Sequence, residues 1–231
     1  MFVTADRLRS DRVPSGDRVI DEKIPIYVGY VYSIYGRPGA GKSNVALSYC
    51  VSAIQMGKTC TWVDTEGKFP HSRLVEVASN RGLTGWENKF QYARVRTVNE
   101  LRRAVSDIVH LSAYGYVTVI DTMINPYRQD RGYQGLGRLA KRQQELAWLI
   151  GELAKYADMH RAVVFIVTHS IESPAADSER HAGGNVLAHM TKLLKVEVVS
   201  GVRYLKAEKL PDVPPVSVPF EICGTGICHK T

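Results

Sequence analysis

The stretch that decides the fold is Gly36-Arg37-Pro38-Gly39-Ala40-Gly41-Lys42-Ser43, followed by Asn44. It matches the pattern G-x-x-x-x-G-K-S/T at every fixed position, after a strand-like run and at the start of a helix-like run. In such a loop, backbone N–H groups surround phosphates, and the dipole of the following helix adds positive potential. The lysine places its charge at the β and γ phosphates, and the serine hydroxyl is a Mg²⁺ ligand. We therefore expect residues 36–44 to bind ATP, or a close relative, with Mg²⁺.

Outside this loop, apolar strand-like runs alternate with helix-like runs. The expected strands are residues 30–35, 59–63, 90–93, 116–120 and 162–167, and the expected helices are 42–56, 70–80, 98–113 and 137–159. Strands that are apolar throughout have both faces covered, so the pattern predicts an α/β fold: a mainly parallel twisted sheet with helices on both faces. Residues 192–222 lack a helical period and contain several prolines, which predicts two or three antiparallel strands along one edge.

The composition is that of one ordinary globular domain: 231 residues, of which 45% are hydrophobic and 23% charged. We expect a single domain over residues 1–231, with an entry segment (1–21), a nucleotide-binding core (22–191) and a C-terminal β extension (192–231). The chain lacks an apolar run of the roughly 18 residues that a membrane span needs, and residues 1–21 lack an apolar signal core, so we expect a cytoplasmic protein. The net charge of +7 favours an anionic partner such as nucleic acid.

The cysteines Cys50, Cys60, Cys223 and Cys228 lack the C-x₂-C spacing of metal sites. Cys223 and Cys228 either form a disulfide or remain free thiols, and free thiols suit a reducing cytosol.

Two carboxylates are expected at the nucleotide. Asp121 ends the strand 116–120, where an acidic residue would hold the Mg²⁺ shell, and Glu66 lies just past the strand 59–63. Because parallel strands end at one edge of a sheet, Glu66 could orient the attacking water near the γ-phosphate. These positions predict ATP hydrolysis, with Lys42 and Glu66 as the catalytic residues. A polar strand end or a solvated turn is the plainer interpretation of each carboxylate.

Several blocks together resemble the RecA/RadA recombinase family, most closely the archaeal RadA paralogues of the RadB or RadC kind, which consist of the ATPase core alone. The blocks are Val63-Asp64-Thr65-Glu66-Gly67, Tyr92-Ala93-Arg94 and Ala182-Gly183-Gly184-Asn185. The resemblance implies a RecA-like P-loop core, a catalytic Glu66, an Arg73 that packs on adenine and an Asp121 that organises Mg²⁺. The short stretch before the core implies that the helix-hairpin-helix domain of full-length RadA is absent.

The same resemblance implies DNA-binding loops after the strand 116–120 and before residue 183. The first contains Arg128, Arg131, Arg138 and Arg142, which suit a phosphate backbone; the alternative is a solvated helix face. The second contains Arg180 but is acidic overall. The expected partners are single-stranded DNA and either a recombinase or further copies of the chain. Phe2-Val3-Thr4-Ala5 resembles a polymerisation motif, and Lys209-Leu210-Pro211-Asp212 resembles the family's nucleotide cap.

One departure from the family concerns the strand after the long helix, where an Asn-Gln pair is replaced by His169-Ser170. His169 either senses the γ-phosphate or simply ends the strand. We therefore expect a DNA-repair accessory ATPase that regulates homologous recombination. The alternatives are a KaiC-like signalling ATPase, which would tend to have a Glu-Glu pair in place of Asp-Thr-Glu-Gly, and a nucleotide-dependent interaction module that does not hydrolyse ATP.

Overall fold

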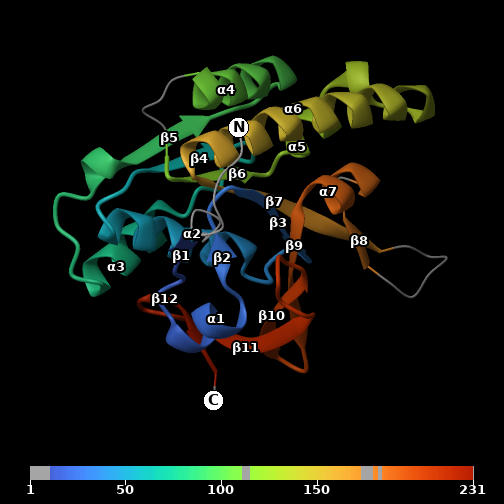
Figure 1. Ribbon diagram of the computed structural model, residues 1–231. Helices are drawn as coiled ribbons and strands as arrows, with labels where there is room; N and C mark the ends of the chain where they lie inside the picture. The colour runs from blue at the N-terminus through green and yellow to red at the C-terminus, as the bar shows by residue number, and fades with distance from the viewer. Residues whose placement is uncertain (1–10, 111–114, 173–178, 182–183, 231) are drawn as a thin grey trace, which may run out of the picture.

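The computed structural model describes residues 11–110, 115–172, 179–181 and 184–230 (Figure 1). Its centre is a sheet with the strand order β12-β11-β10-β9-β3-β7-β6-β4-β5, to which β8 is added beside β7. The parallel part consists of β9 (Lys192–Val199), β3 (Tyr30–Gly36), β7 (Val163–Glu172), β6 (Val117–Asp121), β4 (Cys60–Asp64) and β5 (Phe90–Arg94). The antiparallel part consists of β10 (Val202–Lys209), β11 (Val216–Cys223) and β12 (Gly226–His229), with β8 (Glu179–His181) antiparallel to β7. A separate small sheet pairs β1 (Arg12–Val13) with β2 (Ile26–Tyr27).

Helices cover both faces of this sheet (Figure 1). One face carries α1 (Arg18–Lys23), α2 (Lys42–Gln55) and α3 (His71–Asn80), and the other carries α4 (Val98–His110), α5 (Asn125–Gln129), α6 (Leu139–His160) and α7 (Gly184–Met190). Residues 163–167 of β7 are all apolar because both faces of the strand are covered here. Phe165 packs in the core with α2, whereas its neighbours Val164 and Ile166 pack in the core with α4 and α6. The α/β fold expected from the sequence, with a mainly parallel sheet and helices on both faces, is confirmed.

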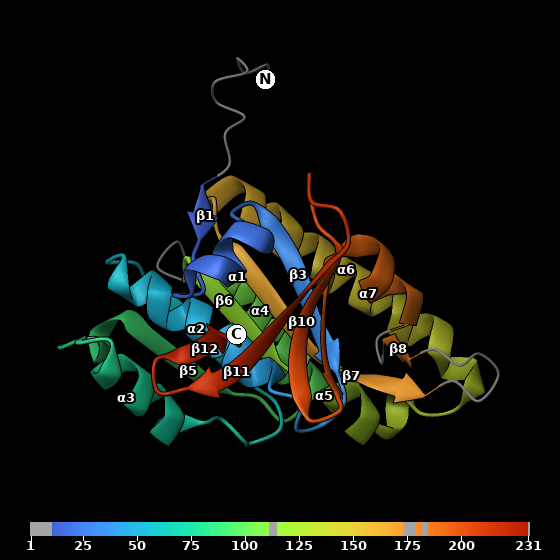
Figure 2. The same cartoon turned by 90° about the horizontal axis from the view of Figure 1, so that it is seen from below.

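The C-terminal extension differs in detail from the expectation of two or three antiparallel strands. Its first strand, β9, is parallel to β3, and three antiparallel strands follow it, so that it contributes four strands in all. Figure 2 shows β10, β11 and β12 next to one another, with β12 beside α2. The last strand escaped the sequence analysis because it has only 4 residues, too few for a recognisable alternation. Helices α5, with 5 residues, and α7, with 7, were not predicted because they are too short to show a helical period.

Hydrogen bonds from Arg81 connect the β11–β12 hairpin to helix α2 and to Ser15. At the C-cap of α3, Arg81 donates to the carbonyl of Thr225 in the hairpin (2.7 Å), to the hydroxyl of Ser52 in α2 (2.6 Å) and to the carbonyl of Ser15 (2.7 Å). One guanidinium therefore joins segments that are far apart in the sequence.

Both cysteine pairs are disulfides. Cys223 is bonded to Cys228 across the β11–β12 hairpin, and Cys50 in α2 is bonded to Cys60 in β4. The first pairing is the disulfide that the sequence left open, and free thiols at these positions are not what the structure has. The second pairing was not expected, because only the packing of α2 against the sheet brings its two cysteines together.

Within the part of the chain that the structure describes, no helix combines the length and apolar character needed to cross a bilayer.

Candidate nucleotide-binding site

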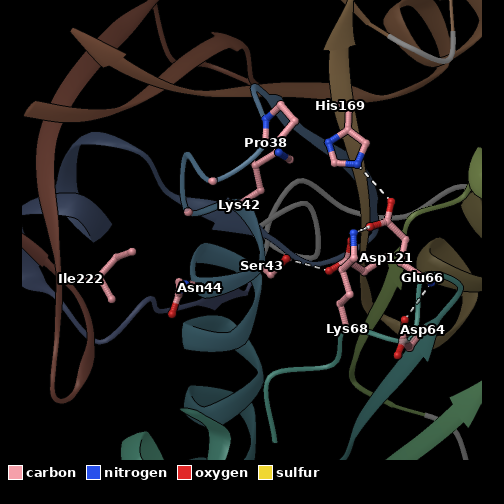
Figure 3. Close-up of a pocket in the computed structure, with 12 residues that line it drawn as sticks. Pro38, Lys42, Ser43, Asn44, Asp64, Glu66, Lys68, Asp121, His169 and Ile222 are labelled. Carbon is pink, nitrogen blue, oxygen red and sulfur yellow. Dashed lines mark hydrogen bonds and ion pairs between the residues drawn. The ribbon is translucent and has the colours of Figure 1, made fainter. Parts of the chain in front are cut away.

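The loop between β3 and α2 opens onto a pocket of about 270 Å³ at the carboxyl edge of the parallel strands (Figure 3). Its lining comes from elements scattered along the chain: Pro38, Gly39, Gly41, Lys42, Ser43, Asn44, Asp64, Glu66, Lys68, Asp121, His169 and Ile222. The residues expected at the nucleotide from the sequence make up most of this set. An open α/β sheet binds ligands at this edge, beyond the carboxyl ends of its strands.

Two glycines of the loop are required by backbone geometry. Gly36 has a φ of 153°, and a Cβ at this position would collide with the carbonyl of Val196 in β9. Gly41 is the N-cap of α2 with a φ of 110°, in the left-handed region that favours glycine. A larger residue at either position would therefore move the loop relative to α2 or β9.

Lys42 is buried, with 5% of its surface exposed, and its ammonium group folds back over its own loop. Its Nζ donates to the carbonyl oxygens of Gly36 (3.0 Å) and Arg37 (2.8 Å). Burial lowers the pKa of Lys42, and the negative charges of Asp121 and Glu66 oppose that change. The loop thus holds a largely desolvated cation, which attracts an anionic ligand more strongly than a solvated lysine would.

Asp121 ends β6 and accepts a hydrogen bond from the hydroxyl of Ser43, 2.7 Å from its Oδ2 (Figure 3). Burial raises the pKa of the Asp121 carboxyl, and the negative charges of Glu66 and Asp64 add to that effect. The peptide bond between Asp121 and Thr122 is cis. A serine hydroxyl beside a carboxylate is the donor set with which Mg²⁺ is commonly held together with substrate phosphates, so these residues fit the ion.

Glu66 lies between two basic side chains. Its Oε1 is 3.0 Å from Nε2 of His169, and its Oε2 is 3.2 Å from Nζ of Lys68 (Figure 3). Partial burial alone would raise the pKa of Glu66, but the hydrogen bonds from His169 and Lys68 lower it below its usual value. The carboxylate is therefore kept ionised and in one place.

Strand register explains why these groups meet. Asp64 at the end of β4 is opposite Asp121, so Glu66 lies two residues beyond that pair. His169 in β7 is opposite Gly36, where the phosphate-binding loop begins. Since β7 and β6 lie between β3 and β4, the pocket is built from four adjacent strands rather than from neighbours in sequence.

Three residues of the pocket were missed by the sequence analysis: Asp64, Lys68 and Ile222. Asp64 fixes the turn that carries Glu66, because its carboxylate accepts from the backbone N–H groups of Glu66 (2.9 Å) and Gly67 (2.7 Å). An aspartate three residues before a glycine, at the start of a turn, is a recognisable signal for such a role. Ile222 comes from β11, and no local pattern indicates it.

Arg73, expected against adenine, is held at the edge of this region. Its Nε donates to Oδ1 of Asn44 (3.1 Å), and its Nη2 donates to the carbonyls of Cys223 and, at 3.0 Å, Gly226. Its guanidinium thus connects α2 to the β11–β12 hairpin. The segment that resembles a nucleotide cap lies at the end of β10, where Lys209 donates to the carbonyl of His189 (2.9 Å).

The basic candidates for DNA contact lie between β6 and the start of α6. Arg128 is in α5, and the exposed Arg131 and Arg138 are in short 3₁₀ turns. The half-buried Arg142 is in the first part of α6. Arg180 is on β8, opposite Ile171, and is therefore on a different element. Residues 2–5, most of the acidic second loop (173–178), and Ala182 and Gly183 lie outside the described residues.

The segment with the basic candidates is anchored by a polar cluster. Arg102 in α4 donates to Oε1 of Glu145 (2.5 Å) in α6 and to the hydroxyl of Tyr133 (2.7 Å), which in turn donates to Glu145. Burial opposes ionisation of Glu145, but these hydrogen bonds, with that of Arg102 first among them, lower its pKa below the usual value.

The chain as a whole is similar to proteins of one family. A model of the Rad51 family matches residues 13–230. The chain belongs to the Rad51 family. Its relatives include meiotic recombination protein DMC1 homolog B of Oryza sativa subsp. japonica, which is 28% identical over 94% of this chain and 68% of that protein. Another is DNA repair protein RAD51 homolog 1 of Arabidopsis thaliana, which is 25% identical over 98% of this chain and 73% of that protein.

Among solved structures, the crystal structure of the RadB recombinase superposes with a TM-score of 0.77, covering 95% of this chain and 100% of that one at 23% identity. This likeness confirms the RecA-like fold. The membership in the recombinase family expected from the sequence blocks is likewise confirmed. The archaeal origin stays a prediction, since the relatives named above are from plants.

Proposed function

We propose that this protein is a DNA-repair accessory ATPase that hydrolyses ATP with Mg²⁺ and binds single-stranded DNA or a recombinase to regulate homologous recombination. The observation that carries the proposal is the meeting of Lys42, Asp121 and Glu66 at one pocket, from elements separated in sequence. The kinship with proteins named for meiotic recombination and DNA repair supports the biological setting.

The roles of the phosphate-binding residues follow from their chemistry. Lys42 would exchange its contacts with the loop carbonyls for phosphate oxygens, because a charged oxygen is a stronger acceptor than a peptide carbonyl. Ser43 and Asp121 would hold Mg²⁺, and the ion when bound would neutralise the negative charge that develops on the phosphates. Their direct contact keeps both ligands in place before the ion arrives.

Glu66 would orient the attacking water. A carboxylate that is ionised and fixed in position is suited to accept a hydrogen bond from water, and the contacts from His169 and Lys68 supply both conditions. His169 is also the candidate for sensing the γ-phosphate, because it lines the pocket beside Glu66. Since phosphoryl transfer depends mainly on positioning and charge, these residues suffice in principle.

The DNA part of the proposal is supported by the exposed arginines between β6 and α6. Arg128, Arg131 and Arg138 present cations without neutralising partners in their own turns, apart from a bond from Arg138 to the carbonyl of Gly132. Such groups contact phosphates without regard to base sequence, which suits a protein that acts on single strands.

The test is ATP turnover with and without single-stranded DNA for the wild type, Glu66→Gln and the matched control Glu221→Gln, an exposed carboxylate on β11. We expect Glu66→Gln to retain ATP binding but to lose hydrolysis by about 100-fold, the usual contribution of a positioned base. Glu221→Gln should behave as wild type. Turnover that survives in Glu66→Gln would exclude the assigned mechanism. ATP binding without turnover in the wild type would instead favour a non-hydrolysing interaction module.

A further inference from the structure

The C-terminal extension places an arginine, Arg203 in β10, directly against the phosphate-binding loop. A Cβ built on Gly41 would lie 3.7 Å from Cδ and 3.8 Å from Nε of Arg203. The same Cβ would lie 3.3 Å from Cδ1 of Ile222, which lines the nucleotide pocket together with Gly41. Arg203 and Ile222 therefore pack beside Gly41, at the start of α2.

Among the described residues, Arg203 has no counter-charge. Its Nε is buried and lacks a hydrogen-bond partner, and no carboxylate of the described residues forms an ion pair with it. The residues opposite it in the sheet are apolar, Val198 on β9 and Phe220 on β11. A buried donor on a permanently charged group is costly when it is unpaired, so Arg203 Nε suits a partner that the described residues do not provide.

Lys206, a second cation on the same strand, is neutralised by a neighbouring carboxylate. Lys206 forms an ion pair with Glu197 in β9, and Glu197 also pairs with Lys195 at 3.1 Å. Lys206 is three residues from Arg203, so the alternation along the strand places the two cations on opposite faces. The unpaired cation is the one on the face of the phosphate-binding loop.

We propose that Arg203 is a phosphate-binding residue of the nucleotide site, which the C-terminal extension contributes to the loop 36–43. This inference rests on the proposed nucleotide function. The ligand class is a nucleoside di- or triphosphate, whose oxygens match the planar, multi-donor guanidinium. Because β10 is paired on both sides, by β9 and β11, the arginine is presented from a fixed backbone. In this proposal the extension contributes a residue to the binding site in addition to its strands in the sheet.

The experiment is a calorimetric titration of Mg²⁺–ATP, Mg²⁺–ADP and adenosine into the wild type, Arg203→Ala, Arg203→Gln and the control Lys206→Ala. We expect both Arg203 variants to bind ADP and ATP about 10-fold more weakly, the usual effect of removing one charge-assisted hydrogen bond. Their affinity for adenosine should be unchanged, because adenosine has no phosphate. Lys206→Ala should bind all ligands as the wild type does. Thermal unfolding of each apo variant checks that the fold is retained, and Arg203→Gln preserves the bulk of the side chain if alanine disturbs β10.

The outcomes separate the two proposals. ADP and ATP affinities that stay at the wild-type level in both Arg203 variants overturn this inference and leave the nucleotide site of Lys42 intact. An equal loss for adenosine and ADP overturns the assignment to phosphate. A wild type that binds none of the nucleotides refutes the proposed function and this inference together.

Discussion

Replacing Arg81 tests how the C-terminal hairpin is held beside the nucleotide site. The guanidinium makes hydrogen bonds with Ser15, Ser52 and Thr225. A hydrogen bond from a charged donor contributes about 1.5 to 3 kcal/mol, and we use the lower value because the bond to Thr225 is exposed. The three contacts then contribute about 4.5 kcal/mol. Freeing the arginine side chain returns about 1.5 kcal/mol of rotamer entropy. We therefore expect Arg81→Ala to lower the free energy of unfolding by about 3 kcal/mol.

The assay is urea unfolding followed by tryptophan fluorescence and circular dichroism, with both disulfides intact. The dependence on urea concentration should keep its slope, because the variant exposes the same surface on unfolding. The matched control is Arg103→Ala, an exposed arginine in α4 that should change the stability by less than about 0.5 kcal/mol. A loss in Arg81→Ala no larger than that of the control would refute the assignment of Arg81 as the junction of these segments.

Two further predictions concern the site and the basic segment. Lys68→Ala should move the acid limb of the ATPase pH profile to higher pH. Lys68 helps to lower the pKa of Glu66, so without it the carboxylate becomes protonated at a higher pH. An acid limb that is unchanged in kcat measured from pH 4 to 8 would contradict this. Arg128→Ala should weaken binding to single-stranded DNA, as measured by fluorescence anisotropy. The slope of log affinity against log salt concentration should fall in magnitude by about 0.7, the value for one phosphate contact. An unaltered slope would show that Arg128 does not contact the strand.

Much of the site could be predicted from the sequence, because its main residues belong to short patterns of neighbouring positions. The loop 36–43 requires its glycines, lysine and serine in consecutive positions, since one strand-to-helix turn supplies them all. Asp121 and Glu66 were found because each follows an apolar strand, and parallel strands end at a common edge.

Other parts of the site could not be predicted in this way. The pairing of Glu66 with His169 depends on β7 and β6 lying between β3 and β4, and strand order is not encoded in any short segment. Ile222 and Arg203 reach the loop from the C-terminal strands, at distances in sequence over which no periodicity operates. The same holds for the disulfide between Cys50 and Cys60, which requires α2 to pack on β4.

By itself the sequence determined the α/β alternation, the phosphate-binding loop and the two carboxylates, because backbone preference and hydrophobic period act over a few residues. Only the tertiary structure decided which side chains share the pocket. In the tertiary structure Glu66 lies between His169 and Lys68, and Arg73 contacts the C-terminal hairpin. Arg203 lies against Gly41 with no counter-charge from the residues that the structure describes. The physical reason is that charges interact through space, and the distances between them are set by strand order and register rather than by separation along the chain.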